Sequence, residues 1–151
     1  MKKTTKLIII VGIFLGLVAC ASGPREEITD YCYRRESETI FWELYIVSEG
    51  DTVVSLTDIF INDITGVEIE EYIEALEEMK ERINAYHGIS LDYRIEDNEF
   101  IRELVILTKE VSTEALLEIG LIDDAPEEGG DVSRIITLEM NKAKGYVCEE
   151  K

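Results

Sequence analysis

A cysteine near the start of the chain follows a short apolar run, and its sulfur is suited to acylation. The run extends from Leu7 to Val18. A helix needs about twenty apolar residues to span a bilayer, so this run is typical of a secretory signal peptide instead. The small residue Ala19 precedes Cys20, which leaves the bond accessible to a peptidase, and a thiolate is a strong nucleophile. Three lysines give the segment its positive start: Lys2, Lys3 and Lys6.

The four residues Leu17-Val18-Ala19-Cys20 resemble a bacterial lipobox, in which the cysteine sulfur receives a diacylglycerol and the cysteine becomes the new N-terminus. Two acyl chains give stable anchoring, because each buried methylene contributes about 0.8 kcal/mol. We therefore predict a signal peptide over residues 1–19, a lipidated tether over residues 20–27 and a single domain over residues 28–151. The alternative is an ordinary or uncleaved signal peptide with an incidental cysteine.

Two further cysteines lie near the two ends of the predicted domain. If Cys20 is acylated, Cys32 and Cys148 remain as an even pair. Such a pair tends to be oxidised outside the cytosol, so we predict a disulfide; two buried free thiols are the alternative. These two thiols and the single histidine, His87, do not complete a tetrahedral zinc shell, so we expect no metal centre there.

The charge of the chain limits its partners. The sequence has 15 basic and 33 acidic residues and a formal net charge of −18 at pH 7. Nucleic acid is excluded as a partner because phosphate binding requires a basic surface. Anionic headgroups would also repel the domain, so membrane attachment depends on the N-terminal lipid. A basic protein or a divalent cation is the complementary partner, although the same charge serves solubility alone.

Calcium binding is the second functional hypothesis. The segment from Asp123 to Asp131 is rich in carboxylates, and oxygen atoms are the ligands that calcium prefers. Its spacing differs from that of an EF-hand loop, and a solvated acidic loop is the alternative.

A carboxylate-dependent hydrolase is the third hypothesis, but the sequence indicates no aromatic sugar cleft. A hydroxyl or thiol nucleophile usually needs a histidine base, so we expect no enzymatic activity and no cofactor.

The remaining sequence predicts an α+β domain with an antiparallel sheet. Aromatic and β-branched residues from Asp30 to Ile61, interrupted near Glu36–Glu38 and at Ser48–Asp51, predict a meander of three strands. Strict alternation from Ile89 to Glu96, the turn residues Asp97-Asn98, and a return strand through Thr108 predict a hairpin.

Helices are expected to pack on this sheet. Apolar residues recur at helical spacing from Ile69 to Tyr86 and predict one long amphipathic helix. Thr65 and Glu68 fit a capping box at its start, and His87 would lie in its last turn, where a positive charge suits the helix dipole. Shorter helices are predicted over residues 113–119 and 133–144. The apolar run Leu104–Leu107 predicts a central strand covered on both faces.

These elements together resemble the YehR-like family of small bacterial lipoproteins. The likeness is carried by the strand–turn–strand segment Leu44–Val53, the helix Ile69–Tyr86 with Gly88, the alternating strand that follows, and the closing helix with Gly145-Tyr146. The resemblance implies a compact α+β domain on a lipid anchor and no catalytic residues. We therefore predict a lipid-anchored protein of the cell envelope, on the extracytoplasmic face of the cell membrane, that acts as a binding or structural module.

Overall fold

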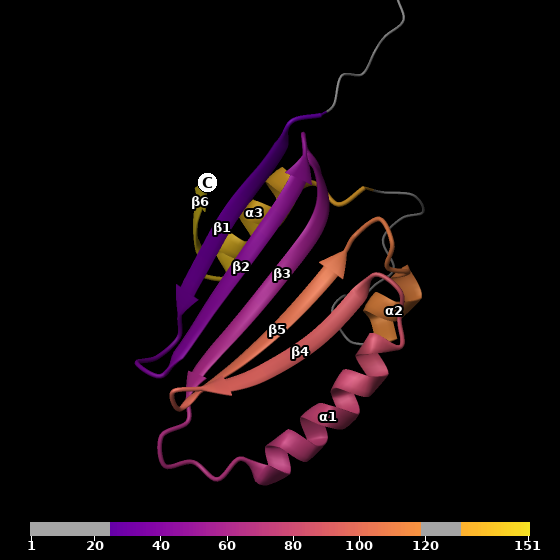
Figure 1. Ribbon diagram of the computed structural model, residues 1–151. Helices are drawn as coiled ribbons and strands as arrows, with labels where there is room; N and C mark the ends of the chain where they lie inside the picture. Colours follow the sequence, from indigo (N-terminus) through magenta and orange to yellow (C-terminus); the bar gives the residue numbers. More distant parts are fainter. Residues whose placement is uncertain (1–24, 119–130) are drawn as a thin grey trace, which may run out of the picture.

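The computed structural model describes residues 25–118 and 131–151. These residues form one six-stranded antiparallel sheet and three helices (Figure 1), which confirms the α+β class. The strand order is β4-β5-β3-β2-β1-β6. The elements are β1 (Glu27–Arg35), β2 (Ile40–Glu49), β3 (Thr52–Asp63), α1 (Glu70–Asn84), β4 (Ile89–Glu96), β5 (Glu99–Leu107), α2 (Thr113–Glu118), α3 (Arg134–Ala143) and β6 (Val147–Glu150).

Two local turns build the sheet as the sequence predicts. Between β2 and β3 the chain turns at Gly50, whose φ of 64° is accessible to glycine at little cost. Between β4 and β5 it turns at Asp97 and Asn98, with φ of 51° and 68°, a conformation that these two residue types tolerate well. The hairpin then joins the meander through antiparallel pairing of β3 with β5.

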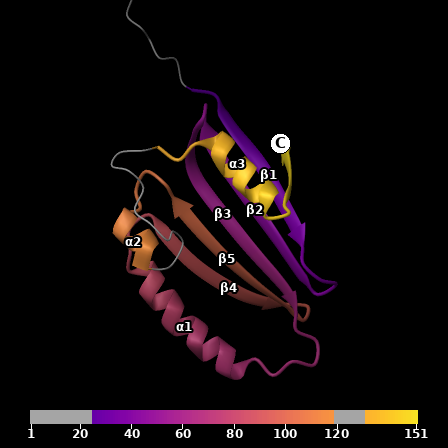
Figure 2. The same ribbon diagram turned by 180° about the vertical axis from the view of Figure 1, so that it is seen from behind.

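The helices lie on one face of the sheet, which we call the helix side. Leu76 and Ile83 of α1 pack in the same buried cluster as residues of β4 and β5. Leu138 of α3 packs against buried residues of β1 and β2. Figure 2 shows α3 over β1 and β2, and α1 beside β4. Within the described residues no helix covers the opposite face, which we call the open face.

The predicted long helix is wrong in its start and its length. Helix α1 has 15 residues, and its N-cap, Ile69, makes no side-chain capping hydrogen bond. The proposed cap, Thr65, lies in a turn, where its backbone N–H donates to Asp63 Oδ1 at 2.8 Å. The next residue, Gly66, has φ of 75°, so the chain changes direction before the helix begins. His87 follows the helix, and its Nε2 lies 3.3 Å from Glu110 Oε2.

The prediction that Leu104–Leu107 is covered on both faces is also wrong. Strand β5 is internal to the sheet, between β4 and β3. Ile106 packs in the cluster under α1, and Leu107, which points to the open face because side chains alternate, is 37% exposed. The apolar run therefore supplies both the helix-side core and part of the open face.

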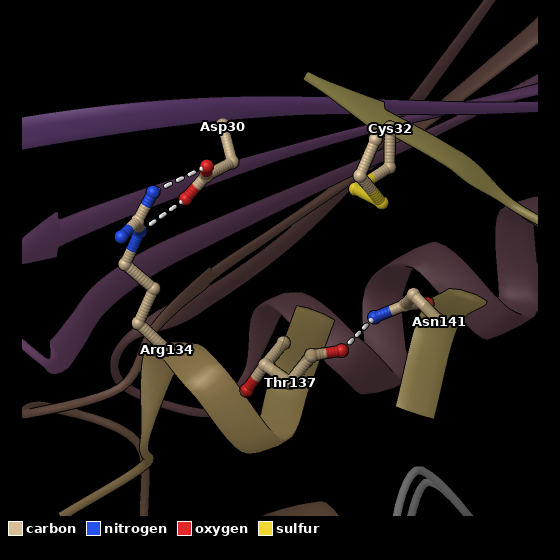
Figure 3. Close-up of a disulfide and its surroundings, with 6 residues drawn as sticks. Asp30, Cys32, Arg134, Thr137 and Asn141 are labelled. Atoms are coloured by element: carbon tan, nitrogen blue, oxygen red, sulfur yellow. Dashed lines mark hydrogen bonds and ion pairs between the residues drawn. A yellow bond between two sulfur atoms is a disulfide. The ribbon is translucent and has the colours of Figure 1, made fainter. Parts of the chain in front are cut away.

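A buried ion pair attaches α3 to the sheet. Ser133 caps this helix, which the sequence predicted over residues 133–144, by accepting a hydrogen bond from the N–H of Ile136. The guanidinium of Arg134 donates to both carboxylate oxygens of Asp30, at 2.5 Å and 2.7 Å, and Asp30 is only 3% exposed. Figure 3 shows this bidentate contact beside Cys32. None of the helices in the described ranges is both long enough and apolar enough to cross a membrane.

Candidate binding site

A row of cationic and aromatic side chains crosses the helix side of the sheet. The register of four strand pairings places these residues opposite one another in turn. From β4 to β1 the row consists of Tyr93, Arg102, Phe60, Trp42 and Arg34. We call it the cation–aromatic row. It is assembled from five strands, β4, β5, β3, β2 and β1.

The two arginines of the row lie against aromatic rings. The Cζ atom of Arg102 is 5.5 Å from the ring centroid of Trp42 and 5.4 Å from that of Phe60. The Cζ atom of Arg34 is 5.7 Å from the Trp42 centroid and 5.1 Å from that of Tyr146. Each such contact contributes about 0.5–1 kcal/mol at an exposed site and more when desolvated. The Trp42 ring therefore has two guanidinium groups within about 6 Å of its centroid, those of Arg34 and Arg102.

Carboxylates neutralise part of this positive charge. Arg102 Nη2 donates to Asp58 Oδ1 at 3.0 Å, and both side chains are about three-quarters buried. Burial raises the pKa of Asp58, and the Arg102 charge opposes that shift. At the other end of the row, Glu36 Oε2 accepts from Trp42 Nε1 at 3.1 Å and lies 3.5 Å from Arg34 Nη2.

Each arginine also has an unused donor. The Nε atoms of Arg34 and Arg102 are buried and have no hydrogen-bond partner within the described part of the chain. A buried donor without a partner costs about 1–3 kcal/mol, so a ligand oxygen that reached either atom would gain that energy. The row thus combines positive charge, free N–H donors and aromatic surface.

An apolar cavity of about 380 Å³ adjoins the row, and Phe60 belongs to both. The cavity lies between the sheet and the segment that leads into α1. Its lining residues are Phe60, Asn62, Ile64, Val67, Glu68, Ile69, Tyr72 and Phe100. A volume of this size accepts a small organic molecule or the end of a larger one.

A second apolar cavity, of about 290 Å³, lies between α2 and α3 and includes Leu56 and Ile106. Asp58 stands between Leu56 and Phe60 on β3, with its side chain on the same face. The Asp58–Arg102 pair therefore lies between two apolar cavities along β3 and β5. This arrangement suits an elongated apolar ligand that carries an anionic group.

The predicted cysteine pair comes together on the helix side. Cys32 and Cys148 are opposite one another in the β1–β6 pairing, and their sulfur atoms are 2.07 Å apart. Figure 3 shows the bridge beside α3. Cys32 is fully buried, so the bridge forms part of the core beneath α3.

The other predicted sites fall mainly outside the described residues. Cys20, the predicted lipidation site, is among them, and so is the acidic segment except for Asp131, whose Oδ2 lies 3.5 Å from Thr52 Oγ1. No group of three or more potential metal ligands occurs in residues 25–118 and 131–151. Calcium binding and lipidation therefore stay predictions.

The cation–aromatic row was not predicted from the sequence. One signal was available: Asp58 and Arg102 are charged residues at positions where the alternation of β3 and β5 calls for apolar side chains on the helix side. The signal is not sufficient alone, because the sequence does not reveal that β3 pairs with β5, and only this pairing brings the two residues together.

Comparison with known proteins supports a fold and no activity. A single antiparallel sheet with the three described helices on one face places the chain among α+β domains. No protein-family model matches the chain, and no curated protein does. Two solved structures are similar. The NMR structure of the E. coli YehR protein matches with a TM-score of 0.65 and 18% identity, over 83% of this chain and 92% of that one. The NMR structure of a protein from Streptococcus pneumoniae TIGR4 matches with a TM-score of 0.60 and 12% identity, over 99% of both chains.

At these identities the likeness establishes the fold alone. The chain has a YehR-like fold, which agrees at that level with the resemblance noted in the sequence. Neither of these two proteins is named for a ligand or an activity, so the function has to be argued from the residues of this chain.

Proposed function

We propose that this protein is a lipid-anchored binding protein of the bacterial envelope, held at the extracytoplasmic face of the membrane by acylated Cys20. Its ligand is an elongated apolar molecule with an anionic group. The observation that carries the proposed ligand class is the pair of unpartnered arginine Nε donors in the cation–aromatic row, whose Phe60 also lines an apolar cavity of about 380 Å³.

The charge of the whole chain makes this ligand class specific. At a net charge of −18 the molecule repels anions from most of its surface. The two arginines of the row are therefore favourable positions for an anion within an otherwise repulsive field. The aromatic and aliphatic walls of the cavity add the free energy of burying the apolar part of the ligand, about 25 cal/mol per Å². Binding therefore depends on both the anionic group and the apolar part of the ligand.

The lipid anchor is tested by metabolic labelling. Cells that produce the full chain are supplied with radiolabelled palmitate, and the purified protein is examined for label. We expect label in the native chain and none in Cys20→Ser, while Cys32→Ser keeps its label as the matched control. Persistent label in Cys20→Ser would show that acylation occurs elsewhere and would overturn the anchoring proposal.

The ligand site is tested with 1-anilinonaphthalene-8-sulfonate, an aromatic anion whose fluorescence rises in apolar surroundings. We expect saturable binding to the native chain. The double variant Asp58→Asn/Arg102→Gln removes the guanidinium at Trp42 without leaving a carboxylate unpaired, and it should weaken binding about tenfold, which corresponds to the loss of one charge-assisted hydrogen bond.

The matched control is Arg94→Gln/Glu96→Gln, which removes an exposed ion pair of β4 (3.3 Å) and, like the double variant, leaves the net charge unchanged. If this control weakens binding as much as the double variant, loss of any arginine–carboxylate pair has the same effect and the site is wrong. Unchanged binding in the double variant would lead to the same conclusion.

A further inference from the structure

The open face of the sheet carries a second feature that the proposed ligand site does not use. Its side chains alternate with those of the helix-side core, so residues next to Cys32 and Leu44 in β1 and β2 point away from the helices. Four aromatic residues occupy such positions: Tyr31, Tyr33, Phe41 and Tyr45. We call them the open-face aromatic path.

The path is continuous across two strands. The ring centroids of Tyr45 and Tyr31 are 5.1 Å apart, those of Tyr31 and Tyr33 are 5.8 Å apart, and those of Tyr33 and Phe41 are 6.2 Å apart. All four residues are partly exposed. A contiguous aromatic surface of this kind, without a covering element in the described residues, marks an interaction site more often than a packing site.

The chain's own cations show what these rings accept. Lys151 Nζ lies 4.0 Å from the ring centroid of Tyr31 and 5.2 Å from that of Tyr45. Arg35 Cζ lies 5.7 Å from the ring centroid of Phe41. Aromatic faces attract cations through the ring quadrupole, and the path already binds a lysine and an arginine in this way.

Carboxylates strengthen the preference for positive charge. Glu43, between Phe41 and Tyr45 on β2, accepts a hydrogen bond from Tyr31 Oη at 2.8 Å. Burial and this bond to Glu43 raise the pKa of the Tyr31 hydroxyl, so the ring stays neutral while the carboxylate stays beside it. By the same alternation, Glu103 and Glu149 also lie on this face. A second copy of the chain would be repelled, because it carries the same net charge of −18.

We propose that the open face is a docking surface for a basic segment of another protein, with lysine or arginine side chains of that segment lying over Tyr31, Tyr33 and Tyr45 beside Glu43. The uncovered surface leaves room for an extended backbone along β1 and β2, and charge complementarity selects a basic occupant. This surface is on the opposite side of the sheet from the cation–aromatic row and does not depend on the ligand proposed above.

The test uses an octalysine peptide as the probe and the full chain in neutral detergent micelles, with binding measured by calorimetry. We expect binding that weakens as salt is raised and no binding of octaglutamate. Tyr45→Leu keeps the charge and the apolar character but removes the ring, and it should weaken binding about two- to fivefold, the value of a cation–π contact at an exposed site.

A matched pair of variants separates this surface from general attraction to an acidic protein. Glu43→Gln and Glu78→Gln each remove one negative charge, the first on the open face and the second on an exposed position of α1. We expect a threefold or larger loss of affinity for Glu43→Gln and less than twofold for Glu78→Gln. The amide still accepts from Tyr31, so the fold is retained.

Three outcomes would overturn the proposal. They are equal losses in the two glutamate variants, unchanged affinity in Tyr45→Leu, and self-association of the native chain that Tyr45→Leu abolishes. The last result would assign the open face to contact between copies of this chain.

Discussion

Reduction of the Cys32–Cys148 bridge is expected to remove a large part of the stability of this domain. The two cysteines are 116 residues apart in the sequence. In the chain-entropy model, a closed loop of that length lowers the entropy of the unfolded chain by about 16 cal/mol/K, or about 5 kcal/mol at 25 °C. Domains of this size have a total free energy of unfolding of about 5–15 kcal/mol, so the reduced protein would be close to the threshold of folding.

The assay is urea unfolding followed by the fluorescence of Trp42, the single tryptophan of the chain. With a slope of about 1–3 kcal/mol per molar urea, a loss of 5 kcal/mol moves the midpoint down by about 2–5 M. The double variant Cys32→Ala/Cys148→Ala should unfold at the same low midpoint with and without reductant, which controls for other effects of the reductant. A change below about 1 kcal/mol on reduction would show that the bridge does not restrict the unfolded chain as argued.

Three further predictions concern single groups. Gly88→Ala should destabilise the fold more than Gly50→Ala, because a Cβ at Gly88 would lie 2.5 Å from a backbone nitrogen whereas a Cβ at Gly50 meets open space. The Gly50→Ala substitution should cost about 1–2 kcal/mol because of the positive φ at that position. Both variants are measured by urea unfolding. The pKa of Asp58, followed by carbon NMR, should lie above 3.8, because burial disfavours its charged form. The folded state then binds more protons than the unfolded state, so stability falls as the pH rises from about 3.8 through the folded pKa, and Asp58→Asn should abolish this fall. Arg134→Met should cost about 3–5 kcal/mol because it leaves the Asp30 carboxylate buried and unpaired, and adding Asp30→Asn should recover part of the loss.

Short-range patterns predicted the sheet well because their cause is local. The alternation of Ile89 to Glu96 and the turn at Asp97-Asn98 depend only on neighbouring residues, and strand β4 has the predicted bounds. The start of the helix predicted over residues 133–144 is local in the same sense, because Ser133 caps it. Such features need no knowledge of how distant segments pair.

The sequence-based predictions failed where two local signals competed, or where the structure depends on pairing between strands that are distant in the sequence. Asp63 captures the N–H of Thr65, and this turn displaces the capping box that the sequence favoured. The cation–aromatic row depends on the β3–β5 pairing, in which Phe60 lies opposite Arg102. In the sequence, these two strands are separated by α1 and β4. Composition and periodicity do not show which distant strand β3 pairs with.

The bridge between β1 and β6 also determines how the domain would respond to mechanical tension. Cys32 and Cys148 are covalently joined, and nearly the whole sheet lies between them in the sequence. A pull exerted between the proposed lipid anchor and the far end of the chain would pass through the sulfur–sulfur bond. Only the short stretches outside the bridge would extend, while β2 to β5 would bear no load and the cation–aromatic row, which lies wholly within the bridge, would keep its shape.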